Sequence, residues 1–339
     1  MARAPHEQEA TPRAPKRAAL VLNPIKVDAP VLREAVVRLS AEAGWAEPLI
    51  YETTVDDWGD DVARQALAEG ADAVLVAGGD GTVRAVAEAL TGSGVLLTIV
   101  PSGTGNLLAR NLSLPLDNPE TMIRATFDGD VHPTDAGIAR LTQADGSTTE
   151  HGFVVMAGIG LDAAMIANTN PQLKKAVGWV AYVDGAARSL PTAKPFRVMY
   201  QMEGHRLHSA KVQSVLFANC GSLPAGIALV PEASISDGIL DVMIIQPAGP
   251  FGWLGVGRKV WWDNSVLRRF RAGRLVLQRR GRDSSIHYFR GRSAEAAPTI
   301  PQPVQLDGDE FGEAARIRCR IVPSGLRIAV PKGHVVAAV

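Results

Sequence analysis

The sequence predicts a two-domain α/β protein in which a parallel sheet covered by helices precedes an antiparallel β-sandwich. Apolar strand segments alternate with amphipathic helix segments up to about residue 131, as they do around parallel sheets. β-Branched runs punctuated by Gly, Pro and Asp follow, a texture typical of sandwiches. The 339 residues suit two domains of about 150 residues. We expect a disordered tail over 1–18, a first domain over 19–137 and a second over 138–331.

Each element expected in the first domain has its own local pattern. The helix over 83–90 places Val83, Val86, Ala87 and Leu90 at the i, i+3, i+4, i+7 spacing of one buried face. Gly70 follows the helix over 61–68 and ends it. The expected strands cover 19–22, 49–51, 74–77 and 95–100, and the expected helices cover 31–39, 61–68 and 83–90.

The second domain is expected to consist of strands with one helical insertion. The expected strands cover 153–156, 196–202, 212–219, 240–245, 304–307, 317–322 and 326–330. The helical region covers roughly 171–190. Neither an internal repeat nor a long low-complexity segment interrupts this order.

Composition limits the environment and the partners. The 35 Lys and Arg residues balance the 35 Asp and Glu residues, so no overall field favours nucleic acid as a partner. Cys220 and Cys319 are too few for a disulfide scaffold and lack zinc-site spacing, which indicates a reduced, cytoplasmic setting. Residues 1–18 lack the apolar core of a signal peptide, and no apolar run approaches the roughly 18 residues that span a bilayer.

The first chemical motif is Gly78-Gly79-Asp80-Gly81-Thr82, which joins an apolar strand to a helix. Glycines let backbone N–H groups approach an anion, and the positive end of the following helix dipole points at the same place. A carboxylate there would repel a phosphate. We therefore expect Asp80 to face Mg²⁺ or a proton that accompanies the phosphate.

The second motif is Pro101-Ser102-Gly103-Thr104-Gly105-Asn106, after the next strand. Neighbouring parallel strands end at one edge of a sheet, so the two turns should lie side by side and suit a triphosphate. The alternative is that both are merely tight turns that use glycine for its positive φ. The chain lacks the P-loop pattern, the protein-kinase signatures and a strand followed by G-x-G-x-x-G, which excludes those nucleotide-binding classes.

Five motifs in order resemble the diacylglycerol kinase catalytic family of bacterial lipid kinases. The resemblance covers 19–331 and is carried by Gly78 to Thr82, Pro101 to Asn106, Gly158 to Ala163, Pro231 to Asp241 and Gln305 to Asp309. Gly-Gly-Asp-Gly-Thr alone is also found in NAD kinases and phosphofructokinase-like folds. The resemblance implies an amino-terminal nucleotide domain of the NAD kinase/diacylglycerol kinase-like type, ATP in the cleft before the sandwich, and last strands that pack back on the first domain.

The resemblance also implies roles for individual residues. The nucleotide contacts would be Asn23, Thr53 or Thr54, Gly78, Gly79, Asp80, Gly81, Thr82, Ser102, Gly103, Thr104 and Asn106. Asp307 or Asp309 would be the general base for a lipid hydroxyl, with Asp309 favoured by the pattern. Asp237, with the carbonyls of Ser234 and Ile239, would hold a metal ion. The alternative for Asp237-Gly238 is an ordinary turn between strands.

The chain departs from the family pattern at three places. Arg84 and Ala85 stand where an Asn-Glu pair is usual, and Leu107 and Leu108 replace an aspartate and an aromatic residue. Asp309 replaces a glutamate. The phosphate-binding parts of both turns are intact, so we interpret these changes as a difference in substrate.

The segment from Arg258 to Arg292 carries a local charge bias. It holds 11 Lys and Arg residues against 2 acidic residues, with Trp253, Trp261 and Trp262 in or just before it. Such a segment could collect a lipid at an anionic membrane surface, or it could be a solvated face.

We therefore expect a cytoplasmic kinase that uses ATP and Mg²⁺ to phosphorylate diacylglycerol to phosphatidic acid at the inner face of the membrane. Another lipid alcohol, such as a sphingoid base or a glycolipid precursor, is the nearest alternative acceptor. An NAD kinase and a non-catalytic lipid-binding regulator are the more distant alternatives. We expect no nucleic-acid partner, and a homodimer stays open.

Overall fold

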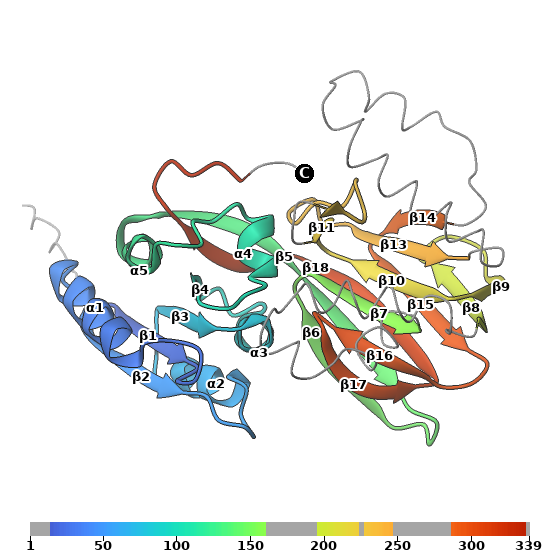
Figure 1. The fold of residues 1–339 in the computed structure, drawn as a ribbon, viewed down its shortest axis with the longest axis horizontal. Coiled ribbons are helices and arrows are strands. Elements are labelled where there is room, and N and C mark those ends of the chain that lie inside the picture. Colours follow the sequence, from blue (N-terminus) through green and yellow to red (C-terminus); the bar gives the residue numbers. More distant parts are fainter. Residues whose placement is uncertain (1–13, 161–194, 224–226, 247–285, 337–339) are drawn as a thin grey trace, which may run out of the picture.

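A computed structural model describes residues 14–160, 195–223, 227–246 and 286–336 (Figure 1). The amino-terminal part is an α/β layer structure and the carboxy-terminal part is a β-sandwich, as expected. The described helices are α1 (Ala29–Glu42), α2 (Asp60–Ala68), α3 (Asp80–Leu90), α4 (Leu107–Asn111) and α5 (Pro119–Asp128).

One mixed sheet runs through both parts of the chain. Its strand order is β2-β1-β3-β4-β18-β15-β8-β9, with β5 paired to β18 and β6 paired to β5. These strands are β1 (Arg17–Leu22), β2 (Ala46–Glu52), β3 (Ala73–Gly78), β4 (Leu96–Pro101), β5 (Asp130–Thr142), β6 (Thr148–Phe153), β8 (Phe196–Met202), β9 (His208–Val212), β15 (Ser293–Pro298) and β18 (Arg316–Val330). The first four strands pair in parallel, and β18 returns to pair in parallel with β4.

A second, antiparallel sheet packs against the carboxy-terminal half of the first. Its order is β14-β13-β10-β7-β16-β17. These strands are β7 (Met156–Gly160), β10 (Ser214–Ala218), β13 (Leu240–Ile245), β14 (Ile286–Gly291), β16 (Gln302–Leu306) and β17 (Asp309–Ala314). A small ribbon pairs β11 (Ser222–Leu223) with β12 (Ile227–Ala228). Apolar side chains from both large sheets, such as Phe153 and Phe217, fill the space between them.

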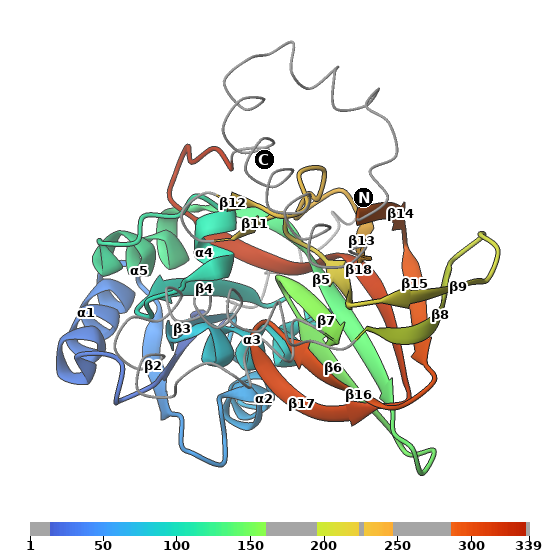
Figure 2. The same ribbon diagram turned by 45° about the vertical axis from the view of Figure 1, so that its right-hand side comes forward.

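Helices cover both faces of the parallel strands because alternate side chains of each strand point to opposite faces. Leu20 and Leu75 lie in one cluster with side chains of α1 and α5. Val21 and Val76 lie in another cluster with side chains of α2 and α3. This arrangement leaves the carboxyl ends of β1 to β4 open for a site, and Figure 2 shows the β16–β17 hairpin beside α3 at that end.

Several expected boundaries are wrong. The expected strand over 153–156 is the junction of two strands, because the N–H groups of Val154 and Val155 donate to Asp307. The strands expected over 317–322 and 326–330 form one strand, β18, with an irregularity between Val322 and Leu326. Helix α3 begins at Asp80, inside the expected turn. The sequence interpretation did not anticipate α4, α5, β5, β6, β9, β14, β15, β17 and the β11–β12 ribbon. The helix expected over 171–190 lies outside the described residues.

Candidate active site

The two glycine-rich motifs lie side by side, as the strand order predicted. Strands β3 and β4 are neighbours, and Gly78 pairs with Pro101 at their carboxyl ends. The backbone N–H of Leu107, at the start of α4, donates to Oδ1 of Asp80 at 2.7 Å. A carboxylate in the first motif therefore holds the segment that follows the second motif.

Most glycines of these motifs allow neighbouring atoms to pack closely, and none of them is needed for a positive φ. None of Gly78, Gly79, Gly81, Gly103 and Gly105 has a positive φ, which removes the interpretation of both motifs as turns that need glycine for that purpose. A Cβ at Gly78 would lie 2.8 Å from the Cβ of Thr82, and a Cβ at Gly81 would lie 2.9 Å from Oδ2 of Asp309. A Cβ at Gly105 would clash with Oδ2 of Asp80. The missing side chains thus let the motifs and the distant Asp309 pack together.

Gly79 differs from these neighbours because nothing lies within 4 Å of the position of its Cβ. It is the N-cap residue of α3, an 11-residue helix whose first turn contains Asp80. The first N–H groups of a helix have no partner within the helix and attract anions. The open space at Gly79 therefore adjoins a suitable place for a phosphate group.

The second motif is held by its own side chains. Asn106 has a φ of 47°, and its side chain donates to the carbonyl of Gly103 at 2.8 Å and accepts from the N–H of Gly103 at 3.1 Å. Ser102 donates its hydroxyl to the carbonyl of Val100 at 2.9 Å. Thr104 is exposed between them. Asn106 and Ser102 thus shape the loop, and Thr104 is open to a ligand.

The remaining predicted nucleotide contacts lie at the ends of β1 and β2. The N–H of Asn23 donates to the carbonyl of Ala77, and the N–H of Thr53 donates to the carbonyl of Leu22. The side chain of Asn23 accepts from the N–H of Ile25, and the hydroxyl of Thr54 accepts from the N–H groups of Asp56 and Asp57. Thr53 is buried, so exposed Thr54 is the better placed of the two to meet a ligand.

Asp307 and Asp309 occupy different environments at the tip of the β16–β17 hairpin. Asp307 and Gly308 form its two-residue turn, with φ values of 50° and 94°, as expected for an Asp-Gly hairpin turn. The buried carboxylate of Asp307 accepts the N–H groups of Val154, Val155 and Met156 at 2.7 to 2.9 Å. Burial raises its pKa to about 6, although these three donors lower it. Asp307 thereby fixes the hairpin on the β6–β7 junction.

Asp309 faces the first motif instead. Its Oδ2 lies 3.3 Å from Nε of Arg84 on α3, across 225 positions of sequence. Sequence reasoning noted Arg84 only as a departure from the family pattern. No local spacing links an arginine on a helix to an aspartate on a distant hairpin, so sequence periodicity carried no signal for this pair.

The charges at this place favour a cation. Burial raises the pKa of Asp80, the N–H of Leu107 lowers it, and the negative charge of Asp309 raises it further. Two carboxylates whose charges interact, near the open space at Gly79, suit Mg²⁺, which proteins hold through one or two carboxylates together with substrate phosphates. Asp80 and Asp309 therefore fit a nucleotide-borne magnesium ion.

The loop expected to hold a second metal does not fit a divalent cation as it is arranged. Oδ2 of Asp237 lies 2.7 Å from Nη2 of Arg290, and Oδ1 accepts the N–H of Ile239 at 3.0 Å. The same guanidinium donates to Oδ1 of Asp241 at 2.9 Å. A guanidinium already neutralises the only acidic side chain among Ser234, Asp237 and Ile239. In the described part of the chain, no three or more His, Cys, Asp or Glu side chains form a metal-binding group.

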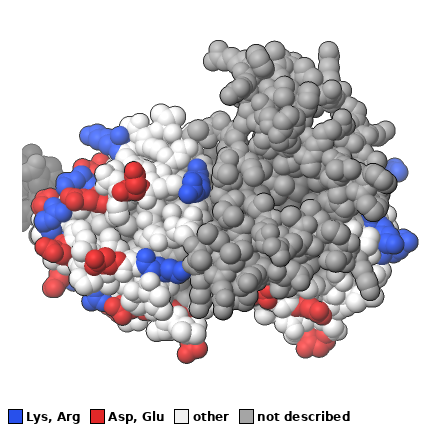
Figure 3. All heavy atoms as spheres, viewed as in Figure 1, with Lys and Arg blue, Asp and Glu red and all other residues white. Residues whose placement is uncertain are grey.

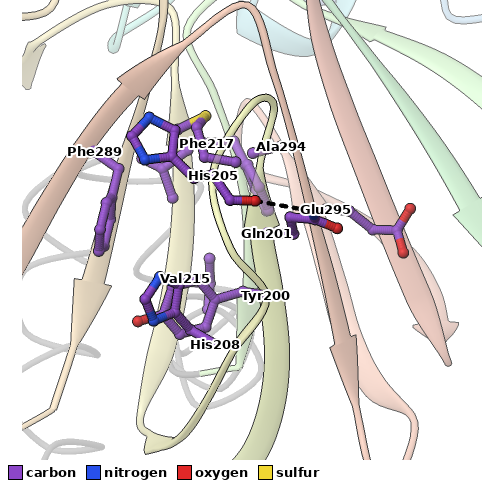
Figure 4. Close-up of a pocket in the computed structure, with 11 residues that line it drawn as sticks. Tyr200, Gln201, His205, His208, Val215, Phe217, Phe289, Ala294 and Glu295 are labelled. Carbon is purple, nitrogen blue, oxygen red and sulfur yellow. Dashed lines mark hydrogen bonds between the residues drawn. The ribbon is translucent and has the colours of Figure 1, made fainter.

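A separate pocket lies inside the sandwich (Figure 4). It is lined mainly by apolar and aromatic side chains, with the rings of Tyr200 and His208 stacked at 5.4 Å and Phe289 beside them. Gln201 donates to the carbonyl of His205 at its edge. None of the motif residues lines this pocket, so the candidate chemistry lies elsewhere.

The surface of the first domain carries both signs of charge. Figure 3 shows Lys and Arg side chains intermixed with Asp and Glu side chains over that part. Of the 11 Lys and Arg residues from Arg258 to Arg292, only Arg290 and Arg292 are described, and Arg290 forms ion pairs with Asp237 and Asp241. The other charges of that segment lie outside the described residues. None of the described helices is long and apolar enough to cross a membrane.

Comparisons with known proteins match both parts of the chain. Residues 17–139 match the diacylglycerol kinase catalytic domain, and residues 153–330 match the YegS C-terminal NAD kinase beta sandwich-like domain. A protein of Pseudomonas aeruginosa named "Probable lipid kinase YegS-like" is 31% identical over 309 residues, which cover 89% of this chain and 86% of that protein.

A second relative matches part of the sequence, and a solved structure matches the fold. A "Diacylglycerol kinase" of Mycobacterium tuberculosis is 31% identical over 181 residues, and the match spans 53% of this chain but only 57% of that relative's length. A crystal structure of a diacylglycerol kinase from Bacillus anthracis superposes with a TM-score of 0.65 at 18% identity, over 94% of this chain and 98% of the other. At that identity the superposition establishes the fold.

Proposed function

Because the chain belongs to the lipid kinase family of YegS-like proteins and diacylglycerol kinases, we propose that it transfers the γ-phosphate of ATP to the hydroxyl of diacylglycerol, forming phosphatidic acid. The observation that carries this proposal is the meeting of three distant motifs. Asp80 accepts the N–H of Leu107, and Asp309 packs against Gly81. The open space at Gly79, the carboxylate proposed for Mg²⁺ and the carboxylate proposed for the acceptor hydroxyl thus belong to motifs that meet.

The ATP phosphates would bind where α3 begins. The space beside Gly79 and the first N–H groups of α3 suit the β- and γ-phosphates, and the exposed hydroxyl of Thr104 is available from the second motif. Asn23 and Thr54, at the ends of neighbouring strands, are proposed to contact the rest of the nucleotide. These groups require little movement of the backbone, because Asn106 and Asp80 already hold both motifs.

Asp80 would hold Mg²⁺ directly or through water. The negative charge of Asp309, which already acts on Asp80, would also attract the ion. When bound, the ion neutralises the charge that develops on the transferred phosphoryl group. Burial and the Asp309 charge raise the pKa of Asp80, so this carboxylate binds a proton more readily than an exposed aspartate. Acid should therefore weaken its hold on a cation.

Asp309 is the proposed general base. It would accept the proton of the lipid hydroxyl as that oxygen attacks the γ-phosphorus and ADP leaves. Asp307 is the weaker candidate, because its two oxygens already accept three backbone N–H groups and a reacting hydroxyl would have to displace them. The side chain of Asp309 is 19% exposed and faces the first motif.

The test is a transfer assay with labelled ATP and Mg²⁺. Acceptors are diacylglycerol, a sphingoid base and a monoacylated glycolipid in mixed micelles, with NAD in a parallel reaction. We expect labelled phosphatidic acid with wild-type protein and none with Asp309→Asn. Transfer to another lipid alone would move the proposal to that acceptor, and transfer to NAD alone would overturn it. Lipid binding without any transfer would favour a regulator that has lost catalysis.

We also propose that the segment from Arg258 to Arg292 meets an anionic membrane from the cytoplasmic side. Its surplus of nine positive charges and its neighbouring tryptophans support this proposal. A diacylglycerol kinase needs such contact, because its substrate stays in the bilayer.

A further inference from the structure

Arg84 is a buried arginine in a place where the fold alone would not require one. It lies in the middle of α3 with only 6% of its surface exposed. Arginine is rarely buried to this extent, because removing its charge from water costs free energy unless partners compensate. Its partners must therefore compensate for the loss of hydration.

Three side chains surround the guanidinium. Its Nε lies 3.3 Å from Oδ2 of Asp309, and its Nη1 lies 2.9 Å from Oε2 of Glu88, one turn further along α3. Its Cζ lies 4.8 Å from the ring centre of Phe311 on β17. Glu88 and Phe311 hold the guanidinium from two sides, so the contact with Asp309 has a fixed direction.

Asp309 is in turn confined between two parts of α3. Gly81 packs against its carboxylate so closely that a Cβ there would lie 2.9 Å from Oδ2, and Arg84 lies one turn further on. Resting on the proposed role of Asp309 as general base, we propose that Arg84 is the positioning residue that aims this carboxylate.

The other charged groups at this place include two acidic side chains. Asp80 and Glu88 on α3 are both acidic, and the negative charges of Asp80 and Asp309 repel each other. His151 on β6 lies 3.9 Å from Glu88 and 4.6 Å from the ring of Phe311, but burial lowers its pKa, so it is neutral at pH 7. Arg84 is thus a positive group in contact with Asp309.

Two substitutions separate the charge of Arg84 from its shape. Arg84→Lys keeps a positive charge and loses the planar fork, whereas Arg84→Gln keeps a hydrogen-bond donor and loses the charge. We expect Arg84→Gln to lower kcat about 100-fold with little change in KM for ATP, because a misplaced base slows chemistry rather than binding. Arg84→Lys should recover at least about tenfold of that loss, because its ammonium can still meet the Asp309 carboxylate. Arg140→Gln, at an exposed ion pair with Glu150, is the matched control and should leave both quantities unchanged.

A purely structural role would lower the unfolding midpoint of Arg84→Gln while the folded variant kept the wild-type kcat, and that result would overturn the proposal. A second measurement is independent of catalysis. In a double-mutant cycle of Arg84→Gln with Asp309→Asn, the effects on the unfolding equilibrium at pH 7 should deviate from additivity by at least about threefold. If wild-type protein transfers phosphate to no acceptor, the proposed function fails, yet coupling in this cycle would still establish the ion pair. Additive effects would overturn the positioning role even in an active enzyme.

Discussion

The backbone N–H of Leu107 donates a 2.7 Å hydrogen bond to Oδ1 of Asp80. The two residues are 27 positions apart, and the contact ties the first turn of α3 to the first turn of α4. Asp80 therefore has a structural function in addition to any contact with a cation. This double use explains why an acidic side chain is tolerated between two turns that are otherwise suited to anions.

Substitutions at Asp80 should separate these two functions. Asp80→Asn retains an oxygen that can accept the Leu107 N–H but loses the charge, so kcat/KM should fall about 100- to 1,000-fold with a small change in stability. Asp80→Ala also loses the hydrogen bond and should unfold about 1 to 2 kcal/mol more easily. Kinase assays and urea denaturation measure the two effects. Full activity in Asp80→Asn would remove the cation role.

Gly79 and Gly105, one in each glycine-rich motif, should respond differently to the same added methyl group. Gly79→Ala meets open space, so its unfolding midpoint should match that of the wild type, while KM for ATP should rise at least tenfold because the methyl group enters the phosphate space. Gly105→Ala would push against Oδ2 of Asp80 and should lower the unfolding midpoint as well as activity.

Thermal unfolding with and without ATP tests this pair. ATP should raise the midpoint of the wild type and should have little effect on Gly79→Ala. An unchanged ATP response in Gly79→Ala would mean that the phosphates bind elsewhere.

Substitution of the two aspartates of the β16–β17 hairpin should have different effects: one on stability and the other on catalysis. Asp307→Asn places an N–H₂ group among three N–H donors and should destabilise the fold by about 3 kcal/mol, because buried donors lose a charged acceptor. Asp309→Asn should stay folded and lose about 100- to 10,000-fold in kcat, the usual contribution of a general base.

Denaturation curves and single-turnover transfer rates distinguish them. A stable Asp307→Asn protein without activity, together with an active Asp309→Asn protein, would reverse the assignment of the base.

Much of this arrangement follows from local sequence, and the rest depends on contacts that local sequence does not encode. The strand over 240–245 was predicted to the residue, because five of its six residues are apolar and turn residues flank it. The meeting of the two glycine motifs followed from the order of parallel strands. The boundary near Phe153 was wrong because Asp307, some 150 positions away, takes the N–H groups that would continue the strand. The Arg84–Asp309 pair was missed for the same reason.

The charge-rich segment should control membrane binding if our proposal for it is correct. Replacing Arg268, Arg269 and Arg271 together by alanine removes three charges, each worth about 1 kcal/mol near an anionic surface, so partitioning should weaken roughly 100-fold. Sedimentation with vesicles that contain anionic lipid measures the partitioning. The salt concentration should be about 0.15 M, where the Debye length is about 8 Å. Arg33→Ala, which breaks an exposed ion pair with Glu52 in the first domain, is the control. Unchanged sedimentation of the triple variant would contradict the membrane contact.

Asp241 should make stability depend on pH in an unusual direction. Its Oδ2 is buried without a hydrogen-bond partner in the described part of the chain, and burial raises its pKa from 3.8 to about 6 despite the contact with Arg290. Between pH 4 and 6 the folded state therefore binds a proton that the unfolded state has released, so this group stabilises the fold in acid and loses that contribution as pH rises through 6. Relative to the wild type, Asp241→Asn should gain about 3 kcal/mol between pH 4 and 7, since the amide has no charge to bury. Urea denaturation of both proteins across this range measures the difference, in which other titrating groups such as Asp307 cancel. A difference that stays flat from pH 4 to 7 would mean that Arg290 compensates fully for the buried charge.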